Sequence, residues 1–539
     1  MKVGGVSETK KNEFFLYFSQ LALPLHTQKK IMAYKIIAPN TLKTSILLPS
    51  SKSISNRVLI LNALSNHSEE IKNISDCDDT KVVIRALRKK KHVIDIGAAG
   101  TAMRFLTAYL SGQNGRFTVT GTERMKSRPI KILIDALRSV GANIEYVEKD
   151  GFPPLRIEGK ALKGGEVHLD GGVSSQYISA LMMIAPTMTN GLRLHLTGNI
   201  ISRPYINLTV QLMRKFGVIV FEEGQTFTIP PQQYSPAGNF TVESDWSAAS
   251  YWYEMIALSE NSAASVSLSG LLSDSVQGDA SIVDFFNKLG VCTAFTSSGV
   301  TLTKKQQAVD DILIFDFLSM PDMAQTAAVT CAMLNIPFKF YGLQSLKIKE
   351  TDRLCALQTE LHKFGYVINI QNDNALEWNG QRCEAEASPV VTTYEDHRMA
   401  MAFAPISLCM KNGIKIADPE VVSKSYPSFW NDLKKAGFMI RSIDSDCCGQ
   451  HDVCERDNLL AAARKKIEYY DDEELDTFRG IASCEYDEKA IEEFSEVLYT
   501  LREEEVAGWL RSLQLRNIYL PDKLKDEAFL IIEEQRKNK

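Results

Sequence analysis

The sequence predicts an α/β protein, and two observations carry that prediction. Between residues 34 and 438, short runs rich in β-branched residues alternate with amphipathic stretches of about 12–15 residues. This alternation is typical of strands that alternate with helices. Several of the amphipathic stretches begin at or just after Gly, Ser or Asp. These residues cap helices, and where they are neutral they leave backbone N–H groups open to an anion.

The individual elements follow from these patterns. A first strand is expected from Met32, and further strands over 117–120, 166–169, 192–197, 265–269, 300–302 and 312–315. Helices are expected over 55–65, 100–112, 128–140, 175–188, 205–216, 245–257, 279–289, 323–333, 350–364 and 395–408.

Length and charge indicate more than one domain. A chain of 539 residues is too long for one hydrophobic core, so two or three domains are expected. The net charge of −5 is uneven, because residues 441–539 hold 25 acidic and 15 basic residues, which leaves +5 for residues 1–440. A mild basic surplus does not predict a nucleic-acid binder, but it suits a cleft that gathers phosphorylated small molecules. The acidic, charge-rich tail predicts helices over 458–469 and 485–501.

Other features point to a soluble cytoplasmic protein. Six cysteines are scattered singly through the first 440 residues, without the spacing of metal ligands, which predicts reduced thiols. No apolar run reaches the roughly 18 residues that a membrane span needs. No cleavage site follows the short apolar stretch near the N-terminus, so a secretory signal is not expected. Because the first strand-like segment begins at Met32, residues 1–33 are expected to be a disordered extension or the result of an upstream mis-start.

Three motifs in the first half carry candidate anion-binding groups. Residues 48–57 (LPSSKSISNR) place two cations and a hydroxyl at the start of a helix, and residues 95–104 (DIGAAGTAMR) add small residues and a further arginine. Residues 121–129 (GTERMKSRP) crowd Arg124, Lys126 and Arg128 together, a repulsion that a bound anion would relieve. Neutral donors follow at residues 171–177 (GGVSSQY) and 202–205 (SRPY), which suit a polyol phosphate.

The second half repeats the theme with carboxylates added. Asp322 precedes a predicted helix, and Lys349, Glu350 and Arg353 crowd into about one helical turn. Residues 394–401 (YEDHRMAM) and 423–429 (SKSYPSF) contribute Arg398 and Lys424. Each motif alone can be a helix cap, a surface pair or a solvated loop. The set together predicts a site for small polyanions.

These segments, in this order, resemble the enolpyruvyl transferases, and within them the shikimate-pathway branch. The resemblance covers residues 34–438 and is most specific at SKSISNR, GTAMR, RMKSRP, SSQ, KETDR and DHRMAM. It implies two similar domains, each of three βαβαββ units, joined by two crossovers. The lower domain would comprise residues 34–51 plus 242–440 and the upper domain residues 52–241. Residues 441–539 would form a small, mostly helical appendage.

The resemblance also implies a reaction and a site. The enolpyruvyl group of phosphoenolpyruvate would pass to the 5-hydroxyl of shikimate 3-phosphate, releasing phosphate, in the biosynthesis of aromatic amino acids. Shikimate 3-phosphate would contact Lys52, Ser53, Arg57, Ser174, Ser175, Gln176, Ser202, Asp322, Ser345 and Lys349. Phosphoenolpyruvate would contact Lys52, Gly100, Arg124, Gln176, Arg353, Arg398 and Lys424.

Asp322 is the expected proton acceptor from the hydroxyl, and Glu350 the expected group for proton exchange at C3, assisted by Lys52. We expect no metal, cofactor, nucleic acid or membrane partner, and a monomer. Two alternatives remain. The UDP-N-acetylglucosamine enolpyruvyl transferases carry a reactive Cys in the loop that matches 121–129, where this chain has none. A sensor that only binds phosphometabolites would be expected to lose Asp322 or Glu350.

Two departures from the family pattern lie near the expected phosphoenolpyruvate site. Ala98 replaces the usual Asn and Phe105 the usual Pro, so we expect weakened or rearranged contacts there rather than loss of activity.

The tail carries a dense group of potential ligands. Residues 446–457 (DCCGQHDVCERD) include Cys447, Cys448, His451, Asp452 and Cys454. The pattern resembles the CCxxHDxC helix of secreted phospholipases, but the Gly-rich calcium loop that should precede it is absent. Phospholipase activity, a zinc or disulfide site, and a non-catalytic helical appendage all remain open.

Overall fold

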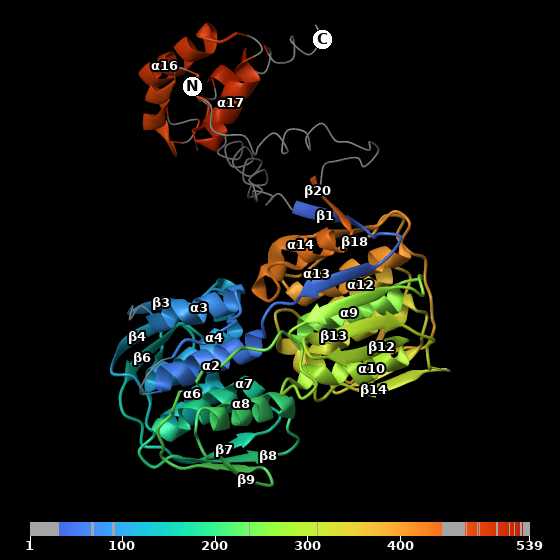
Figure 1. Ribbon diagram of the computed structural model, residues 1–539. Coiled ribbons are helices and arrows are strands. Elements are labelled where there is room, and N and C mark those ends of the chain that lie inside the picture. The colour runs from blue at the N-terminus through green and yellow to red at the C-terminus, as the bar shows by residue number, and fades with distance from the viewer. Residues whose placement is uncertain are drawn as a thin grey trace, which may run out of the picture. The chain divides into compact units, whose positions relative to one another are not determined.

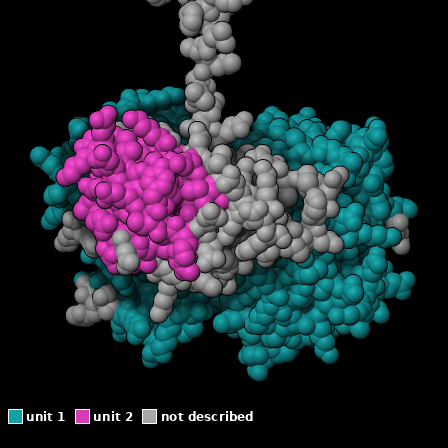
Figure 2. Space-filling model, turned by 90° about the horizontal axis from the view of Figure 1, so that it is seen from above, with its two compact units in different colours: residues 1–446 teal, residues 447–539 magenta. Residues whose placement is uncertain are grey.

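The computed structural model describes residues 32–444 and 469–531, apart from 66–68, 89–91, 237, 310, 471, 482, 484–485, 503–504, 517, 522, 526 and 529–530. The chain divides into two compact units, Met1–Asp446 and Cys447–Lys539 (Figure 2). Residues 1–31 of the predicted extension lie outside the described residues, whereas its last two residues, Met32 and Ala33, belong to the first strand, Met32–Ile37. The Cys/His motif at 446–457 also lies outside the described residues. No helix among the described residues is long and apolar enough to cross a membrane.

The first unit contains two separate hydrophobic cores, one built from residues 54–242 and one from 36–48 and 246–438. We call these parts the upper and the lower half. They are joined where the chain crosses twice, and the two crossovers run side by side: Ser50 bridges to Ser244, and the Ser51 amide donates to the Glu243 carbonyl. Two crossovers between two α/β halves are the architecture that the sequence resemblance implies (Figure 1).

The upper half contains two βαβαββ groups, each with a four-stranded sheet of one parallel and two antiparallel pairs. The first consists of β3 (Val93–Asp95), α4 (Gly100–Ser111), β4 (Gly115–Thr120), α5 (Glu123–Lys126), α6 (Lys131–Ser139), β5 (Asn143–Tyr146) and β6 (Leu155–Gly159). The second consists of β7 (Gly165–Asp170), α7 (Ser175–Ile184), β8 (Leu192–Thr197), α8 (Arg203–Lys215), β9 (Phe221–Glu223) and β10 (Thr226–Ile229).

A third, reduced group completes the upper half. Its helices are α2 (Lys52–Leu64) and α3 (Asp78–Arg88), and in place of a sheet its extended segments form the isolated bridges Ser65–Tyr234 and Lys72–Thr241. Several helices of this half are buried on most sides. In α4, for example, all but two of the residues are buried. A helix that is apolar nearly all round packs inside a domain, which explains why short apolar stretches here are helices rather than strands.

The lower half contains three four-stranded sheets, and the N-terminal strands β1 (Met32–Ile37) and β2 (Lys43–Leu47) complete two of them. β2 pairs with β11 (Ser265–Ser269), which is joined by α9 (Trp246–Leu258), α10 (Ile282–Lys288), β12 (Val291–Thr296) and β13 (Gly299–Lys304). The next group consists of β14 (Leu313–Asp316), α11 (Ala324–Met333), β15 (Phe338–Tyr341), α12 (Arg353–Lys363), β16 (Asn369–Gln371) and β17 (Ala375–Trp378). The last consists of β18 (Val390–Val391), α13 (His397–Phe403), β19 (Ile414–Ala417), α14 (Phe429–Lys435), β20 (Met439–Asp444) and the inserted β1.

The second unit is helical in its described residues. It contains the 3-10 turn η7 (Glu473–Phe478) and the helices α16 (Glu488–Thr500) and α17 (Val506–Leu515) around a small core that includes Phe494 and Trp509. Asp472 and Arg516 form an ion pair in which neither side chain is exposed, and the Trp509 indole donates to the same carboxylate at 2.8 Å. The helix predicted over 485–501 is therefore present, while the one predicted over 458–469 lies almost wholly outside the described residues.

The edge of the first unit gives a first testable prediction. β20 extends to Asp444, past the boundary predicted at residue 440, and pairs with β1 from Met32 to Ile37. A chain cut after Ile440 should lose at least about 2 kcal/mol of stability relative to one cut after Asp446, because each lost backbone hydrogen bond costs about 0.5–1.5 kcal/mol. Urea unfolding followed by tryptophan fluorescence measures the difference. Equal midpoints for the two truncated chains would contradict the role of β20.

Candidate active site

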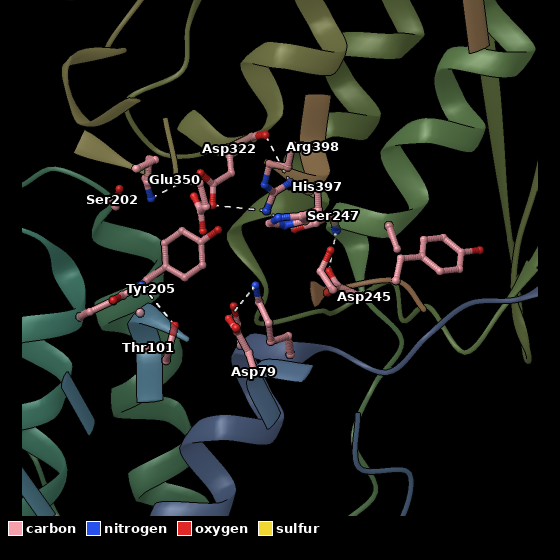
Figure 3. Close-up of a pocket in the computed structure, with 18 of the residues that line it drawn as sticks. Asp79, Thr101, Ser202, Tyr205, Asp245, Ser247, Asp322, Glu350, His397 and Arg398 are labelled. Atoms are coloured by element: carbon pink, nitrogen blue, oxygen red, sulfur yellow. Dashed lines mark hydrogen bonds and ion pairs between the residues drawn. The ribbon is translucent and has the colours of Figure 1, made fainter. Parts of the chain in front are cut away.

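A polar cavity lies between the two halves of the first unit, and both contribute side chains to it (Figure 3). It is lined by Lys52, Ser53, Arg57, Asp79, Gly100, Thr101, Arg128, Ser174, Ser175, Gln176, Ser202, Tyr205, Asp245, Ser247, Ala248, Tyr251, Asp322, Lys349, Glu350, Arg353, His397, Arg398, Met401, Ser425 and Tyr426.

The N-terminus of α2 supplies two cations to the upper side of the cavity. Ser51 caps the helix by accepting from the Ile54 amide, which turns the first helical N–H groups toward the cavity edge. Lys52 lies 3.3 Å from the Asp79 carboxylate of α3. Burial alone would lower the pKa of Lys52, but Asp79, with help from Glu350, raises it above the ordinary value. Lys52 is therefore charged at neutral pH.

Arg57 is a buried guanidinium without a carboxylate partner among the residues that the structure describes. It donates to the hydroxyl of Thr209 at 2.7 Å and to that of Ser179 at 3.3 Å, and its guanidinium lies 5.3 Å from the centre of the Phe105 ring. Burial lowers the pKa of Arg57 to about 10. An arginine desolvated against neutral partners gains most from an anion that enters the cavity.

The cations of the loop at residues 121–129 lie in different surroundings. Arg128 lines the cavity, and its guanidinium lies against the backbone of α4, since a Cβ on Gly100 would lie only 2.7 Å from Arg128 Nη1. Gly100 is therefore required for this close approach. Burial and the neighbouring Arg104 lower the pKa of Arg128, and its Nε has no partner among the described residues. Arg124 is exposed and donates to the Glu350 carbonyl of the lower half instead.

Neutral donors line the opposite edge of the upper half. Ser174 caps α7, and the Gln176 side chain donates to the Thr101 hydroxyl at 3.3 Å. Ser202 precedes α8 in the left-handed conformation, with φ of 57°, and its amide donates to the Leu318 carbonyl of the lower half. A left-handed serine is held only where its surroundings fix it, and here the contact across the cavity does so.

Arg353 organises the lower side of the cavity. It is 2% exposed and donates to three carboxylates: Asp396 at 2.7 Å, Asp322 at 2.8 Å and Glu350 at 2.9 Å. Asp352 caps α12 by accepting from two backbone amides, which fixes the helix start that carries Arg353. Because a buried arginine with three acceptors is costly to move, it holds both candidate acid–base carboxylates in place.

The remaining lower cations pair with the same two carboxylates. Lys349 and Arg398 lie 3.4 Å and 3.3 Å from Asp322, and Lys424 lies 3.0 Å from Glu350. Burial alone would raise the pKa of both carboxyls. Lys349 and Arg398 nevertheless hold that of Asp322 well below its usual range, and Lys424 and Arg353 do the same for Glu350. Both groups are ionised in this arrangement.

His397 lies at the floor of this cluster and is 1% exposed. Burial and the nearby charge of Lys52 lower its pKa well below the usual value, so the imidazole is neutral. Neither ring nitrogen has a hydrogen-bond partner among the described residues. A neutral imidazole among cations adds no further positive charge to a site that already holds several.

Most of the predicted site residues meet in this cavity, but three do not line it. Arg124 and Lys424 instead line a small second pocket, to which Arg128 and Glu350 of the cavity also contribute. Ser345 is half-buried, and its hydroxyl has no partner among the described residues. Asp79 was not among the residues predicted from the sequence, and Arg128 was predicted only as one cation of the loop at residues 121–129. Phe105 is fully buried and lies beneath Arg57, so this departure affects the support of a cation rather than the cavity surface.

Asp279, which bonds to two residues that line the cavity, gives a prediction about pH. It is 4% exposed and accepts from the Tyr205 and Ser247 hydroxyls. Burial, opposed by Arg398, raises its pKa to about 6. A carboxyl whose folded pKa exceeds the unfolded value of about 3.9 contributes stability that is lost as pH rises through the folded pKa.

The variant Asp279→Asn lacks this titration. From pH 5 to pH 7 the wild-type unfolding free energy should therefore fall by about 1 kcal/mol relative to that of the variant. Urea unfolding at both pH values measures this, with the exposed Asp284→Asn as the control that should track wild type. A constant difference between wild type and Asp279→Asn would refute the assignment.

The chain is similar to a known protein family and to several of its members. The model of the family EPSP synthase (3-phosphoshikimate 1-carboxyvinyltransferase) matches residues 36–92 and 87–433. A protein of that enzyme name from Bacteroides fragilis is 57% identical over 411 residues, covering 76% of this chain and 99% of the relative. One from Tolumonas auensis is 36% identical over 416 residues, covering 72% and 95%.

A solved EPSP synthase from Acinetobacter baumannii shares the fold, with a TM-score of 0.62 at 20% identity, covering 76% of this chain and 100% of that one. The match to the family model ends at residue 433, before the acidic tail. The boundary between the two compact units lies close by, after Asp446. Together with the cavity between two α/β halves, they show that the chain belongs to the family EPSP synthase (3-phosphoshikimate 1-carboxyvinyltransferase).

Proposed function

We propose that this chain transfers the enolpyruvyl group of phosphoenolpyruvate to the 5-hydroxyl of shikimate 3-phosphate and releases phosphate. One observation carries the proposal: a single cavity collects cations from both halves around the two carboxylates Asp322 and Glu350. Two substrates that together bring two phosphates and two carboxylates need such a set of cations. The two protein carboxylates provide the proton transfers that the reaction needs.

For shikimate 3-phosphate we propose the surface formed by the upper half together with Asp322 and Lys349 of the lower half. The contacts are assigned to Lys52, Ser53, Arg57, Ser174, Ser175, Gln176, Ser202, Asp322 and Lys349. The unpaired charge of Arg57 and the neutral hydroxyls of the serines support this side for a substrate with anionic groups and hydroxyls. Ser345 is left out because it does not line the cavity.

For phosphoenolpyruvate we propose Lys52, Gly100, Gln176, Arg353, Arg398 and Lys424, with Arg128 in place of Arg124. Arg128 supports this choice because its guanidinium is desolvated, faces the cavity beside Gly100 and lacks a carboxylate partner among the described residues. A carboxylate or phosphate oxygen would satisfy the unpaired N–H groups.

The acid–base roles depend on the substrates themselves. A carboxylate held by three cations is a weak base, so Asp322 as it stands is poorly suited to take a hydroxyl proton. Substrate anions that draw Lys349 and Arg398 toward themselves raise the basicity of Asp322 only when both substrates are present. The same argument applies to Glu350 and Lys424, with Glu350 exchanging the proton at C3. Protonation is thereby coupled to occupancy of the cavity.

We also propose that the enzyme acts as a cytoplasmic monomer, since one chain supplies every residue of the cavity.

Purified full-length protein tests the activity by phosphate release. Release should require both phosphoenolpyruvate and shikimate 3-phosphate, and UDP-N-acetylglucosamine should not replace the latter. Folded protein that releases no phosphate above background with both substrates would refute the proposal.

A further inference from the structure

A second cluster of polar side chains lies away from the cavity, on the outer face of the sheet formed by β7, β8, β10 and β9. Glu166 and His168 come from β7 and His195 from β8, and these strands are parallel neighbours in which His168 is paired directly with His195. Figure 1 shows α7 and α8 on one side of these strands, and the cluster belongs to the alternate residues that point the other way. We call Glu166, His168 and His195 the outer cluster.

The geometry of the outer cluster brings three ligand atoms together. The two imidazole rings stack with centroids 4.6 Å apart and planes 13° apart. Glu166 Oε1 lies 2.6 Å from His195 Nε2 and 3.6 Å from His168 Nε2, and one atom from each residue falls within 4.8 Å of the others. Two ligand atoms bound at about 2.0–2.2 Å around a tetrahedral ion lie about 3.3–3.6 Å apart. The contact of Glu166 with His168 has this spacing, whereas the contact of Glu166 with His195 would have to open by about 1 Å.

His195 is oriented as metal-binding histidines are. Its Nδ1 lies 3.0 Å from the Thr226 hydroxyl of β10, the next strand of the sheet. An Nδ1–H that donates to this oxygen leaves the lone pair on Nε2, which faces Glu166. That Nε2 is enclosed and has no well-aligned hydrogen bond among the described residues, although the carboxylate oxygen is 2.6 Å away. Without a metal ion, an ion pair or hydrogen bond accounts for this distance, and a bound metal ion would replace the proton that the two atoms share.

The simpler alternative for Glu166 is an ion pair across the strands. Arg193 is paired opposite Glu166 in the register of β7 and β8, on the same exposed face. The described contacts nevertheless give Glu166 no ion pair with Arg193, and its carboxylate turns to the histidines. The carboxylate therefore lies with the two imidazoles, and the three side chains together offer a ligand set.

We propose that the outer cluster binds a divalent transition-metal ion of the zinc class through Glu166, His168 and His195. Two imidazoles and one carboxylate suit zinc rather than calcium or magnesium, which prefer oxygen ligands. Water completes a tetrahedral shell, because the exposed side of the cluster faces solvent. The ion ties β7 to β8, the strands that lead into Ser174 and Ser202 at the starts of α7 and α8.

Zinc titration by calorimetry tests the site in the full-length chain. The background carries Cys447→Ser, Cys448→Ser, Cys454→Ser and Cys484→Ser, so that thiols of the tail contribute no ligand. One zinc ion per chain should bind, and His195→Ala and His168→Ala should each weaken this binding at least about tenfold. His362→Ala, which removes an exposed histidine of α12, is the matched control and should bind as the background does.

Thr226→Val probes orientation rather than ligation and should weaken zinc binding about 10- to 100-fold, as loss of a partner to a ligating histidine does. Zinc should also raise the thermal midpoint of the background protein and leave that of His168→Ala unchanged. His168 is exposed, so its loss does not threaten folding. Zinc binding of equal strength in the background and in His168→Ala, or none at millimolar zinc, would overturn the proposal.

Discussion

Arg128→Ala is expected to lower kcat/KM for phosphoenolpyruvate by roughly 30- to 1000-fold, whereas Arg124→Ala should lower it less than about tenfold. Removing one cation from a buried site leaves the bound anion unpaired, which costs about 2–4 kcal/mol. Arg128 meets that condition because it lines the cavity beside Gly100. Arg124 is exposed, does not line the cavity and donates to the backbone carbonyl of Glu350.

The two variants control for each other, since both remove an arginine from the same loop. Steady-state kinetics with each substrate varied in turn should place the loss from Arg128→Ala in the terms for phosphoenolpyruvate. Circular dichroism and urea unfolding establish that both variants fold. If Arg124→Ala shows the larger loss, the cation that contacts the substrate is the one first chosen from the sequence, and the assignment of Arg128 is wrong.

The choice between these arginines shows what a sequence motif can and cannot resolve. Arg124 and Arg128 are spaced as neighbours on one helix face, and the resemblance implied Arg124 as the contact to phosphoenolpyruvate. The structure ends α5 at Lys126, so Arg128 lies beyond the helix and points elsewhere. A helix that ends one turn early changes the direction of a side chain, and a motif does not record where the helix ends.

The fold class could be predicted because the strand and helix periods are strong in the sequence. The boundary of the first unit was harder to predict from the sequence. The last residues of β20 are in a strand because they pair with β1, which lies far away in the chain. The outer cluster could not be predicted from the sequence for the same reason. His168 and His195 are far apart in the chain and meet only because α7 joins two parallel strands in register. Contacts made by tertiary pairing leave no local pattern.

The carboxylates illustrate the opposite case. Glu350 and Arg353 lie one helical turn apart in sequence, and the structure keeps them in contact at 2.9 Å. Asp322 comes from a distant segment of the chain, but its position just before a helix could be predicted from the sequence. Local spacing therefore predicted the members of the charge network, while their partners, such as Asp396 and Asp79, came only with the fold.

Glu350→Gln should lower kcat by roughly 10²- to 10⁴-fold, the range typical of a lost general acid–base group, while changing KM for either substrate far less. The glutamine keeps the shape of the side chain and can still accept from Arg353, but it cannot carry the proton to and from C3. It also leaves Lys424 without its carboxylate, which strengthens the hold of Lys424 on a substrate anion. A fall in kcat together with an unchanged or lower KM is therefore the expected signature.

The matched control is Glu360→Gln, on helix α12, which begins three residues after Glu350. Glu360 is fully buried and bonds to Lys363 and Tyr394, but it does not line the cavity. Both variants should lose stability in urea unfolding, because each removes a buried charge that has partners. Only Glu350→Gln should lose turnover, and it should also slow the solvent-deuterium exchange at C3 of phosphoenolpyruvate. If Glu350→Gln raises KM and leaves kcat intact, the residue binds substrate and another group moves the proton.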